Sequence, residues 1–236
     1  MLLTRLSLFQ FSFLTTGFAG GTSESIDMNE RSVIDIAMPQ EHLTKKILRD
    51  AARTLFAEQG YNGVSMREIA QKIGKQPGGI YNHFPNKQSI LLDLMLENLS
   101  RAHDAVIAPI KSDEPADEQL EGFVRRHLRH NIDNPDDIFI AYMELRSLET
   151  ENSAVITAKR DAYEGALRDI LKRGATSGVF TISDPAIHAR AILSMLGGVT
   201  IWFREGGEQS SDDVAETYIQ AVLQSAGVTY NPQSER

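Results

Sequence analysis

The clearest structural signal in the chain is the segment YNGVSMREIAQKIGKQPGGIYNHFPNKQSIL, residues 61–91. Within it, Ser65 and Glu68 have the spacing of a capping box, in which a Ser begins a helix and a Glu three residues later bonds back to it. The helix should run to about Ile73 and stop at Gly74. The first half of the segment therefore predicts one short, capped helix.

A second, very short helix is predicted over about 76–82. Pro77 suits its first turn, where the missing backbone N–H costs nothing. Gly78 and Gly79 each cost a helix about 1 kcal/mol relative to Ala, but they let the backbone approach a bulky surface such as a phosphate chain or a base edge. Two short helices joined this tightly, with the second free to enter a major groove, predict a helix-turn-helix.

The residues after these glycines divide between core and surface. Ile80 and Phe84 are four apart, so they can face the core and anchor the second helix. Tyr81, Asn82 and His83 are then directed elsewhere and are candidates for contact with DNA. For Tyr81, a plain core position remains the alternative.

The charge of the chain is unevenly distributed. Its net charge is −8, yet residues 39–90 carry eight basic and four acidic groups, a net +4, whereas residues 91–236 carry −10. One short basic segment in an acidic chain is typical of a local DNA-binding module and argues against a protein that bends DNA over its whole surface. Lys45, Lys46 and Arg49 in this segment are interpreted as a solvated face whose charge aids non-specific association.

Residues 43–89 resemble the DNA-binding signature of the TetR repressor family, which includes a run of Gly–x–(Leu/Ile)-Tyr–x-His-Phe followed by a Lys. The resemblance implies that Ser65 caps its helix and touches a phosphate, and that Gly78 lies against the DNA backbone. It also implies contacts with phosphates or the groove edge for Tyr81, His83 and Lys87, the last at the start of the next helix.

Base recognition is expected from Arg67 and Gln76, because both side chains can make bidentate contacts. The sequence departs from the family pattern at Ile73, at Lys75, which can add a phosphate contact, and at Gln76-Pro77, which makes the operator unpredictable from the family. The candidate DNA-binding residues are Ser65, Arg67, Lys75, Gln76, Pro77, Gly78, Tyr81, Asn82, His83 and Lys87.

Further helices are predicted on both sides of this segment, from apolar residues that recur at helical spacing. They cover about 43–59, 87–106, 117–131, 136–149, 152–176, 184–205 and 211–226. No segment alternates with period two between turn signals, so the fold class is all-α. We divide the chain into a three-helix DNA-binding domain at 39–86, a helical-bundle domain for ligand binding and dimerisation at 87–228, and a flexible tail at 229–236.

Residues 1–38 show no clear helical or strand pattern. Their beginning weakly imitates a secretory signal, with one Arg, a broken apolar stretch and small residues after it. Met28 and Met38 both precede the well-patterned sequence. We expect a dispensable or wrongly assigned extension, and a native disordered arm and a true signal peptide remain the alternatives.

Seven side chains near the centres of the predicted helices are candidates for lining an apolar cavity with a few polar groups, the usual form of a small-molecule site. They are Phe123, Phe139, Tyr142, Met143, Arg146, Tyr163 and Met195. For each, an ordinary core position is the alternative. An anionic ligand would need cations at the pocket mouth, and the candidates are Arg125, Arg126, Arg129 and Lys159, with ordinary surface charge as the alternative.

Residues 161–227 resemble the ligand domains of TetR-type regulators of steroid-ring and phenylacetate catabolism. The matching residues are Gly174, Gly178, Phe180, Asp184-Pro185, Trp202-Phe203, Gly206-Gly207, Ser210 and Val214. This resemblance implies an acyl-coenzyme A thioester as effector. It also implies a homodimer in which the last two long helices pack against their copies.

Two amphipathic faces are expected in those helices, 184–205 and 211–226, and we interpret them as the dimer interface. They consist of Ile192, Leu193, Leu196, Val199, Thr200 and Trp202, with Val214, Tyr218, Ile219 and Val222. Gly197-Gly198 fits the close approach of two helices. Burial within a single chain is the alternative.

No enzyme and no cofactor are expected, because no Ser-His-Asp order, phosphate loop or HExxH motif stands out. His127 and His130 with Asp133 allow a metal site, but solvated helix residues are the preferred interpretation. The chain has no cysteine and no apolar run near the ~20 residues that span a bilayer, which suits the cytoplasm. The residues predict a regulator of transcription, and the family resemblance implies a repressor rather than an activator.

Overall fold

The computed structural model describes the chain from Gln40 to Val228 and its side chains from Thr44 onward. Every regular element in this range is a helix, which confirms the predicted all-α class. None of the described helices combines the length and the apolar character that crossing a bilayer would need. The predictions for residues 1–38 and 229–236 lie outside the described part of the chain.

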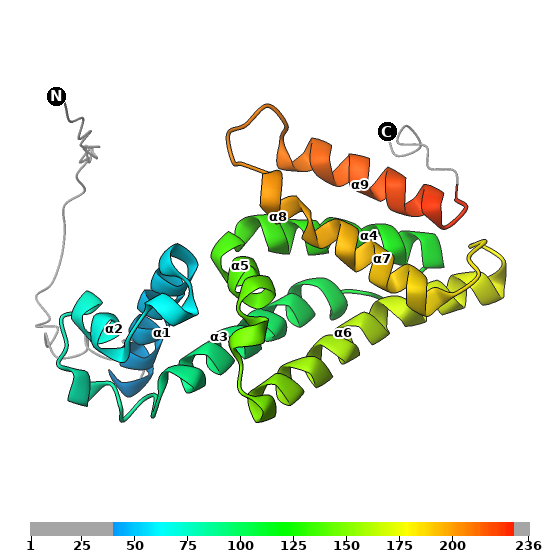
Figure 1. Cartoon of the computed structure of the whole chain (residues 1–236). Coiled ribbons are helices and arrows are strands. Elements are labelled where there is room, and N and C mark those ends of the chain that lie inside the picture. Colours follow the sequence, from blue (N-terminus) through cyan, green and yellow to red (C-terminus); the bar gives the residue numbers. More distant parts are fainter. Residues whose placement is uncertain (1–39, 229–236) are drawn as a thin grey trace, which may run out of the picture. The chain divides into compact units, whose positions relative to one another are not determined.

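The N-terminal part consists of α1 (Gln40–Gln59), the 3₁₀ turn η1 (Tyr61–Gly63), α2 (Met66–Lys72) and the 3₁₀ turn η2 (Pro77–Gly79), as Figure 1 shows in blue and cyan. These elements share one core with the first half of the following helix, because each turns an apolar face inward. Its largest fully buried side chains are Leu48, Phe56, Ile69, Ile80, Ile90, Leu91 and Leu94, together with Ile140 and Ile156 from later helices. The predicted N-terminal helix-turn-helix is confirmed.

The second helix of this motif is shorter than predicted. Only Pro77–Gly79 form a 3₁₀ turn, and residues 80–83 continue as turns in place of the helix expected over 76–82. Two adjacent glycines add backbone freedom and remove the side chains that stabilise a helix, which explains the loss of regular structure. Ile80 still closes the segment, because its carbonyl accepts from two of the following backbone N–H groups.

The long helix α3 (Lys87–Ala102) leads from the helix-turn-helix into the C-terminal part (Figure 1). Asn86 begins it, with its side chain accepting from the N–H of Ser89. The helix continues into a π-helical turn, η3 (His103–Ile107). The sequence predicted one regular α-helix over 87–106 and did not indicate that its last turn is π-helical. Because α3 contacts α1 as well as the later helices, it physically links the two parts.

The C-terminal part contains α4 (Ala116–Asp133), α5 (Pro135–Met143), the 3₁₀ turn η4 (Leu145–Ser147), α6 (Thr150–Ser177), α7 (Pro185–Gly197), α8 (Val199–Trp202) and α9 (Ser211–Ser225). Two predicted helices are divided. The one expected over 136–149 ends at Met143, and the one expected over 184–205 breaks after Gly197 and ends at Trp202. Two adjacent glycines explain the second break.

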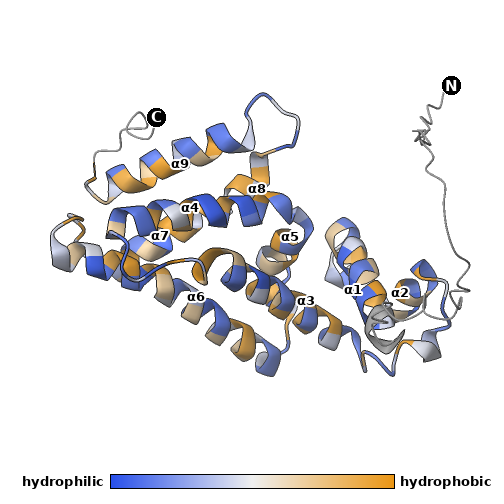
Figure 2. Cartoon of the chain, turned by 180° about the vertical axis from the view of Figure 1, so that it is seen from behind, coloured by the Kyte–Doolittle hydropathy of each residue, from blue (hydrophilic) through white to orange (hydrophobic). Residues whose placement is uncertain are grey.

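The C-terminal core includes six residues that the sequence analysis assigned to a dimer interface. They are Ile192, Leu196, Val199, Val214, Ile219 and Val222. For these residues the assignment is wrong, because they are buried within the chain, where α8 and α9 pack on α4 and α7 packs on α6 and α4. Hydrophobic and hydrophilic residues alternate along α7 and α9 in Figure 2, as expected for helices with one buried face. The large apolar side chains left exposed on α7 and α8 are Ile187, Met195, Ile201 and Trp202.

Candidate DNA interface and ligand pocket

The capping box at Ser65 is present as predicted. The hydroxyl of Ser65 accepts from the N–H of Glu68, whose carboxylate accepts in return from the N–H and hydroxyl of Ser65. The side chains of Ser65 and Arg67 are exposed at this end of α2. An exposed helix N-terminus favours an anion such as a phosphate, so both positions suit the predicted contact with DNA.

A sharp turn follows α2 at Gly74, whose φ of 67° lies in the left-handed region that favours glycine. The carbonyl of Ala70 accepts from the N–H groups of Ile73 and Lys75, which closes the turn. Beyond it the side chains of Lys75 and Gln76 are exposed. Both are therefore accessible to DNA.

Two buried side chains anchor the second half of the motif. Ile80 and Phe84 are 1% and 2% exposed, as predicted, whereas Tyr81 is 49% exposed and does not belong to the core. A Cβ added at Gly78 or Gly79 would meet no atom of the described chain within 4 Å. Packing within the chain therefore does not require glycine at either position. This absence of a packing requirement supports the prediction that another molecule approaches the backbone closely here.

The other candidates in this segment differ in exposure. Asn82 is exposed, while Pro77 and His83 are half-buried. Half-burial still leaves part of each side chain accessible. Their contacts with DNA stay a prediction.

Lys87 has a structural role that the sequence did not reveal. Its ammonium group donates to the carbonyls of Tyr61 and Val64, at 2.7 and 2.6 Å, and lies 4.1 Å from the centre of the Tyr61 ring. Burial lowers the pKa of Lys87, against the opposing effect of Glu144 and Glu68. Two of its three N–H donors thus hold the turn before α2, which leaves one for the predicted phosphate contact.

The basic residues of α1 are engaged in ion pairs. Lys45 and Arg49 both reach the carboxylate of Asp93 on α3, at 3.0 and 2.6 Å, and Lys46 lies 3.1 Å from Asp50. These pairs favour the interpretation of a charged face over specific DNA contacts.

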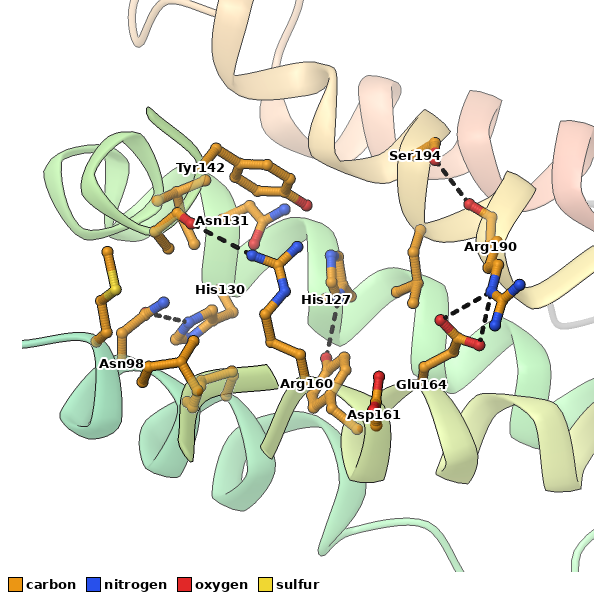
Figure 3. A pocket seen from close by; sticks show the side chains of 18 residues that line it. Asn98, His127, His130, Asn131, Tyr142, Arg160, Asp161, Glu164, Arg190 and Ser194 are labelled. Carbon is orange, nitrogen blue, oxygen red and sulfur yellow. Dashed lines mark hydrogen bonds and ion pairs between the residues drawn. The ribbon is translucent and has the colours of Figure 1, made fainter. Parts of the chain in front are cut away.

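A pocket of about 410 Å³ lies between α3, α4, α5, α6 and α7 (Figure 3). Its apolar wall includes Met95 and Leu99 of α3, Ile138 of α5, Ile156 of α6 and Leu193 of α7. The volume falls within the range of ~300–1,000 Å³ that is usual for small-molecule sites. The C-terminal part therefore contains a cavity of the kind predicted.

Four polar side chains meet in this pocket as two hydrogen-bonded pairs. Nδ1 of His127 lies 2.8 Å from the hydroxyl of Tyr163, and Nε2 of His130 lies 3.0 Å from Oδ1 of Asn98. Burial, with a smaller effect of the neighbouring His130, lowers the pKa of His127 to about 3. Burial also raises the pKa of Tyr163 and lowers that of His130. The two rings and the phenol are therefore uncharged near neutral pH.

The charged groups of the pocket come from α6 and α7, and they balance. Nε of Arg190 lies 3.1 Å from the carboxylate of Glu164, and Arg160 and Asp161 follow one another along the wall. The guanidinium of Arg160 donates to a backbone carbonyl of α5 and lies 5.4 Å from the centre of the Tyr142 ring. The pocket thus offers polar groups without a net charge.

The predicted ligand-binding residues only partly coincide with this pocket. Tyr142 and Tyr163 line it. Phe123 is fully buried behind them, with its ring centre 5.7 Å from that of His127 and 5.8 Å from that of Tyr163. Phe123 therefore supports the wall and does not form it.

The other four predictions need correction, because these side chains lie outside the pocket: Phe139, Met143, Arg146 and Met195. In α5, Ile138 and Tyr142 are four residues apart and line the pocket, so Phe139 and Met143 face away from it and are exposed. Arg146 and Met195 are exposed as well.

The four cations expected at the pocket mouth do not line the pocket either: Arg125, Arg126, Arg129 and Lys159. Arg125 pairs with Glu121 and Glu216, and Arg129 with Asp212. Arg126 donates to the carbonyl of Val106. Ordinary ion pairs and surface charge, the alternative from the sequence, describe these residues better.

Several polar residues that line the pocket were not predicted as ligand-binding from the sequence, among them His127, Asn131 and Arg160. A signal for two of them was present, since Phe123, His127 and Asn131 recur every four residues and share one face of α4. The interpretation of His127 and His130 as solvated is wrong, because each is only 7% exposed. Among the side chains that the structure describes, from Thr44 onward, no three of His, Cys, Asp or Glu are grouped as a metal site would need.

A helix-turn-helix in the first part and a ligand-sized pocket in an all-helical second part define a one-component DNA-binding regulator. Residues 48–94 match the family model of bacterial regulatory proteins of the tetR family, and residues 113–226 match that of the tetracyclin repressor-like C-terminal domain. The chain belongs to the tetR family of transcriptional regulators, which confirms the resemblance found in its sequence.

Similar proteins agree with this assignment. A solved regulatory protein of the tetR family from Rhodococcus RHA1 is 30% identical and has a TM-score of 0.75, with 79% of this chain and 98% of that chain covered. The HTH-type transcriptional repressor KstR2 of Rhodococcus jostii is 25% identical over 78% of this chain and 91% of its own length. The structure of AibR in complex with isovaleryl coenzyme A and operator DNA is 22% identical, covers 76% of this chain and 97% of its own, and shares the fold with a TM-score of 0.72.

Proposed function

We propose that this protein is a repressor that binds a two-fold symmetric operator as a homodimer and leaves it when a small molecule fills the pocket. The observation that carries the proposal is that the same two helices, α3 and α5, form walls of the pocket and contact α1. In this proposal residues 39–86 bind DNA, and residues 87–228 bind the effector and dimerise.

For the DNA interface, we assign base recognition to Arg67 and Gln76, because both are exposed and capable of bidentate contacts. Backbone contacts are assigned to the other candidates, which position the protein without reading sequence. They are Ser65, Lys75, Pro77, Gly78, Tyr81, Asn82, His83 and the remaining N–H donor of Lys87.

The junction between pocket and DNA-binding helices depends on Asp137 of α5. This side chain is 5% exposed and accepts from Nε of Arg53 on α1 at 2.7 Å and from Arg101 on α3 at 2.5 Å. Ile138 and Tyr142 of the same short helix line the pocket. A ligand that displaces α5 therefore strains the contacts that hold α1 in place.

A second set of contacts follows the end of α5. Oε1 of Glu144 accepts from the N–H of Tyr61 at 3.0 Å. Nε2 of Gln88 on α3 donates to the hydroxyl of Tyr61 and to the carbonyl of Ser147. Movement of α5 and η4 is thereby passed to η1, directly before α2.

Release of DNA requires that the effector bind the DNA-incompetent arrangement more tightly than the competent one. In a dimer, two recognition segments must fit successive major grooves about 34–36 Å apart. Since that spacing is fixed by the DNA, a small displacement of the helices that carry these segments is enough to weaken binding.

For the dimer we propose an interface over α7, α8 and α9. Ile187, Met195, Ile201 and Trp202 are exposed on α7 and α8, and large apolar side chains left exposed are typical of a surface that another chain covers. Light scattering should give twice the monomer mass. A monomer that still binds its operator would contradict this part of the proposal.

For the effector we propose an acyl-coenzyme A thioester, which is supported by the pocket and by the isovaleryl coenzyme A bound in AibR, a protein of the same fold. A regulator of bacterial transcription works where the DNA is, so we assign the protein to the cytoplasm. No catalytic activity is part of the proposal.

Selection from a pool of random DNA duplexes with the purified full-length chain tests the proposed function. We expect enrichment of one pseudo-palindromic site, and a loss of preference at one position of each half-site for Gln76→Ala. Gln71→Ala, on an exposed position of α2 outside the candidate set, is the control and should keep the preference. If the protein binds DNA from the pool but enriches no particular sequence, the result would instead favour a structural DNA-bending protein.

A further inference from the structure

Two nitrogen atoms on α4 are buried without a hydrogen-bond partner among the described residues: Nε2 of His127 and Nδ2 of Asn131. Their side chains are 7% and 2% exposed, and both line the pocket. The residues are four apart, so they share a face of α4, which Figure 3 shows turned toward Arg160. Buried polar groups of native proteins nearly always have a partner, because burial without one is unfavourable.

Both nitrogen atoms act as donors. The side-chain nitrogen of Asn131 carries two N–H groups. The His127 ring is neutral, and we assign its single proton to Nε2 with the phenol of Tyr163 donating to Nδ1, because the reverse arrangement would leave the phenol proton without an acceptor among the described residues. The wall therefore presents two adjacent N–H donors that no acceptor of the described chain satisfies.

We propose that His127 and Asn131 bind the carbonyl oxygen of an uncharged acyl group, such as that of a thioester. The inference deepens the proposed function, on which it rests, by naming the chemistry that the effector site recognises. A neutral oxygen fits because Arg160 and Arg190 are balanced by Asp161 and Glu164 on the same wall. A free carboxylate would add an unbalanced charge to this buried site.

The size of the pocket fits a ligand whose acyl group is bound inside while the coenzyme A part stays outside. The pocket volume of about 410 Å³ lies toward the lower end of the range of ~300–1,000 Å³ that is usual for small-molecule sites. That space suits an acyl chain of moderate length together with its carbonyl group, and it is too small for a coenzyme A nucleotide as well. The acyl group is therefore the part of the ligand that His127 and Asn131 bind, while the polar coenzyme A part lies outside the pocket.

Calorimetric titration of the full-length protein with matched compounds tests the donor pair. A panel from butanoyl- to decanoyl-coenzyme A first identifies the best chain length. The same chain is then compared as the S-alkyl thioether of coenzyme A, in which a methylene group replaces the carbonyl, and as the free acid. We expect the thioester to bind about tenfold more tightly than the thioether, and the free acid to bind most weakly.

Two variants connect this preference to the two side chains. Asn131→Leu removes one donor at similar volume, and His127→Phe removes the other while an aromatic ring still packs on Phe123. In each we expect the difference between thioester and thioether to shrink to about twofold. The melting temperature of the unliganded Asn131→Leu protein should not fall, because the substitution removes a buried amide nitrogen that has no hydrogen-bond partner and is therefore unfavourable in the folded chain. Asn152→Leu on α6, outside the pocket, is the matched control and should keep the preference.

Three results would overturn the inference: equal affinity for thioester and thioether, a full preference retained in both variants, or tightest binding of the free acid. Affinity for the selected operator is measured in parallel without any coenzyme A compound. A wild-type protein that binds the operator but none of the acyl compounds contradicts the carbonyl site and the proposed effector, and leaves the proposed DNA-binding function standing. Failure to bind any operator contradicts the proposed function.

Discussion

Arg53 of α1 and Asp137 of α5 form an ion pair between a DNA-binding helix and a helix that lines the pocket, with 2.7 Å between Nε and Oδ1. The carboxylate also accepts from Arg101 of α3. Since Asp137 is almost fully buried, removing its charge takes the carboxylate partner from Arg101 and one of three carboxylates from Arg53, which keeps Asp50 and Glu97. This residue therefore contributes both to stability and to the transmission of ligand binding.

Asp137→Asn should lower the free energy of unfolding by about 3 kcal/mol, and it should reduce the change in operator affinity that the effector causes. Urea unfolding and fluorescence anisotropy of a labelled operator measure the two effects. Asp50→Asn is the control, because Asp50 also pairs with Arg53, but its side chain is 43% exposed and its ion pairs are with residues of its own helix. Its cost should be about 0.5 kcal/mol. A stable Asp137→Asn protein with a full effector response would contradict the role of α5.

Lys87→Met should lower the melting temperature as well as operator affinity, because the ammonium group holds the carbonyls of Tyr61 and Val64. Lys75→Ala, in contrast, should leave the melting temperature unchanged, weaken binding to all sequences alike and flatten the salt dependence by about one ion. Differential scanning fluorimetry and salt titrations separate the two. Equal melting temperatures for both variants would show that the contacts of Lys87 are not stabilising.

The helix-turn-helix was predictable because its signals are local. Ser65 and Glu68 cap a helix three residues apart, and Gly74 marks the turn without reference to the rest of the chain. The contacts of Lys87 were not predictable, since their acceptors are backbone carbonyls 26 and 23 residues away, which leave no mark in the sequence.

The pocket was only partly predictable for a different reason. Helical periodicity shows which residues share a face, but not which face turns inward. In α5 the pair Ile138 and Tyr142 lines the pocket, while Phe139 and Met143, equally apolar and equally spaced, do not. The inward face is set by the packing of α5 against other helices, which a single sequence does not contain.

Acid should destabilise the folded chain through His127. Its pKa of about 3 lies below the ordinary value of 6.5, so below about pH 6.5 the unfolded chain takes up a proton that the native chain does not. The free energy of unfolding therefore falls with decreasing pH between about 6.5 and 3, by about 1.4 kcal/mol per pH unit from this group. The lowered pKa values of His130 and His188 add in the same direction. Urea unfolding at fixed protein concentration, from neutral pH to about pH 5, measures the slope.

His127→Phe should reduce this slope by the contribution of one group, while Gln71→Ala, which removes no titratable group from an exposed position, should leave it unchanged. The melting temperatures at neutral pH show whether each variant is folded. An identical slope in wild type and His127→Phe would mean that the buried ring does not govern the acid sensitivity.

Filling the pocket should imitate the effector. Ala102 lines it at the end of α3, and Ala102→Trp should give a folded dimer with weak operator binding, at a cost in stability of about 1–3 kcal/mol for the added volume. Ala158→Trp, on the exposed side of α6, is the control and should bind the operator normally. A folded Ala102→Trp protein with normal operator affinity would show that filling the pocket does not weaken DNA binding, and would contradict the proposed link between the two sites.

The most direct test is the dissociation constant of the selected operator measured by fluorescence anisotropy with and without a saturating acyl-coenzyme A thioester that calorimetry has shown to bind. We predict that the thioester weakens operator binding at least about tenfold, and that saturating operator weakens thioester binding by the same factor, as linkage requires. A thioester that binds the protein tightly and leaves the operator dissociation constant unchanged would contradict the account.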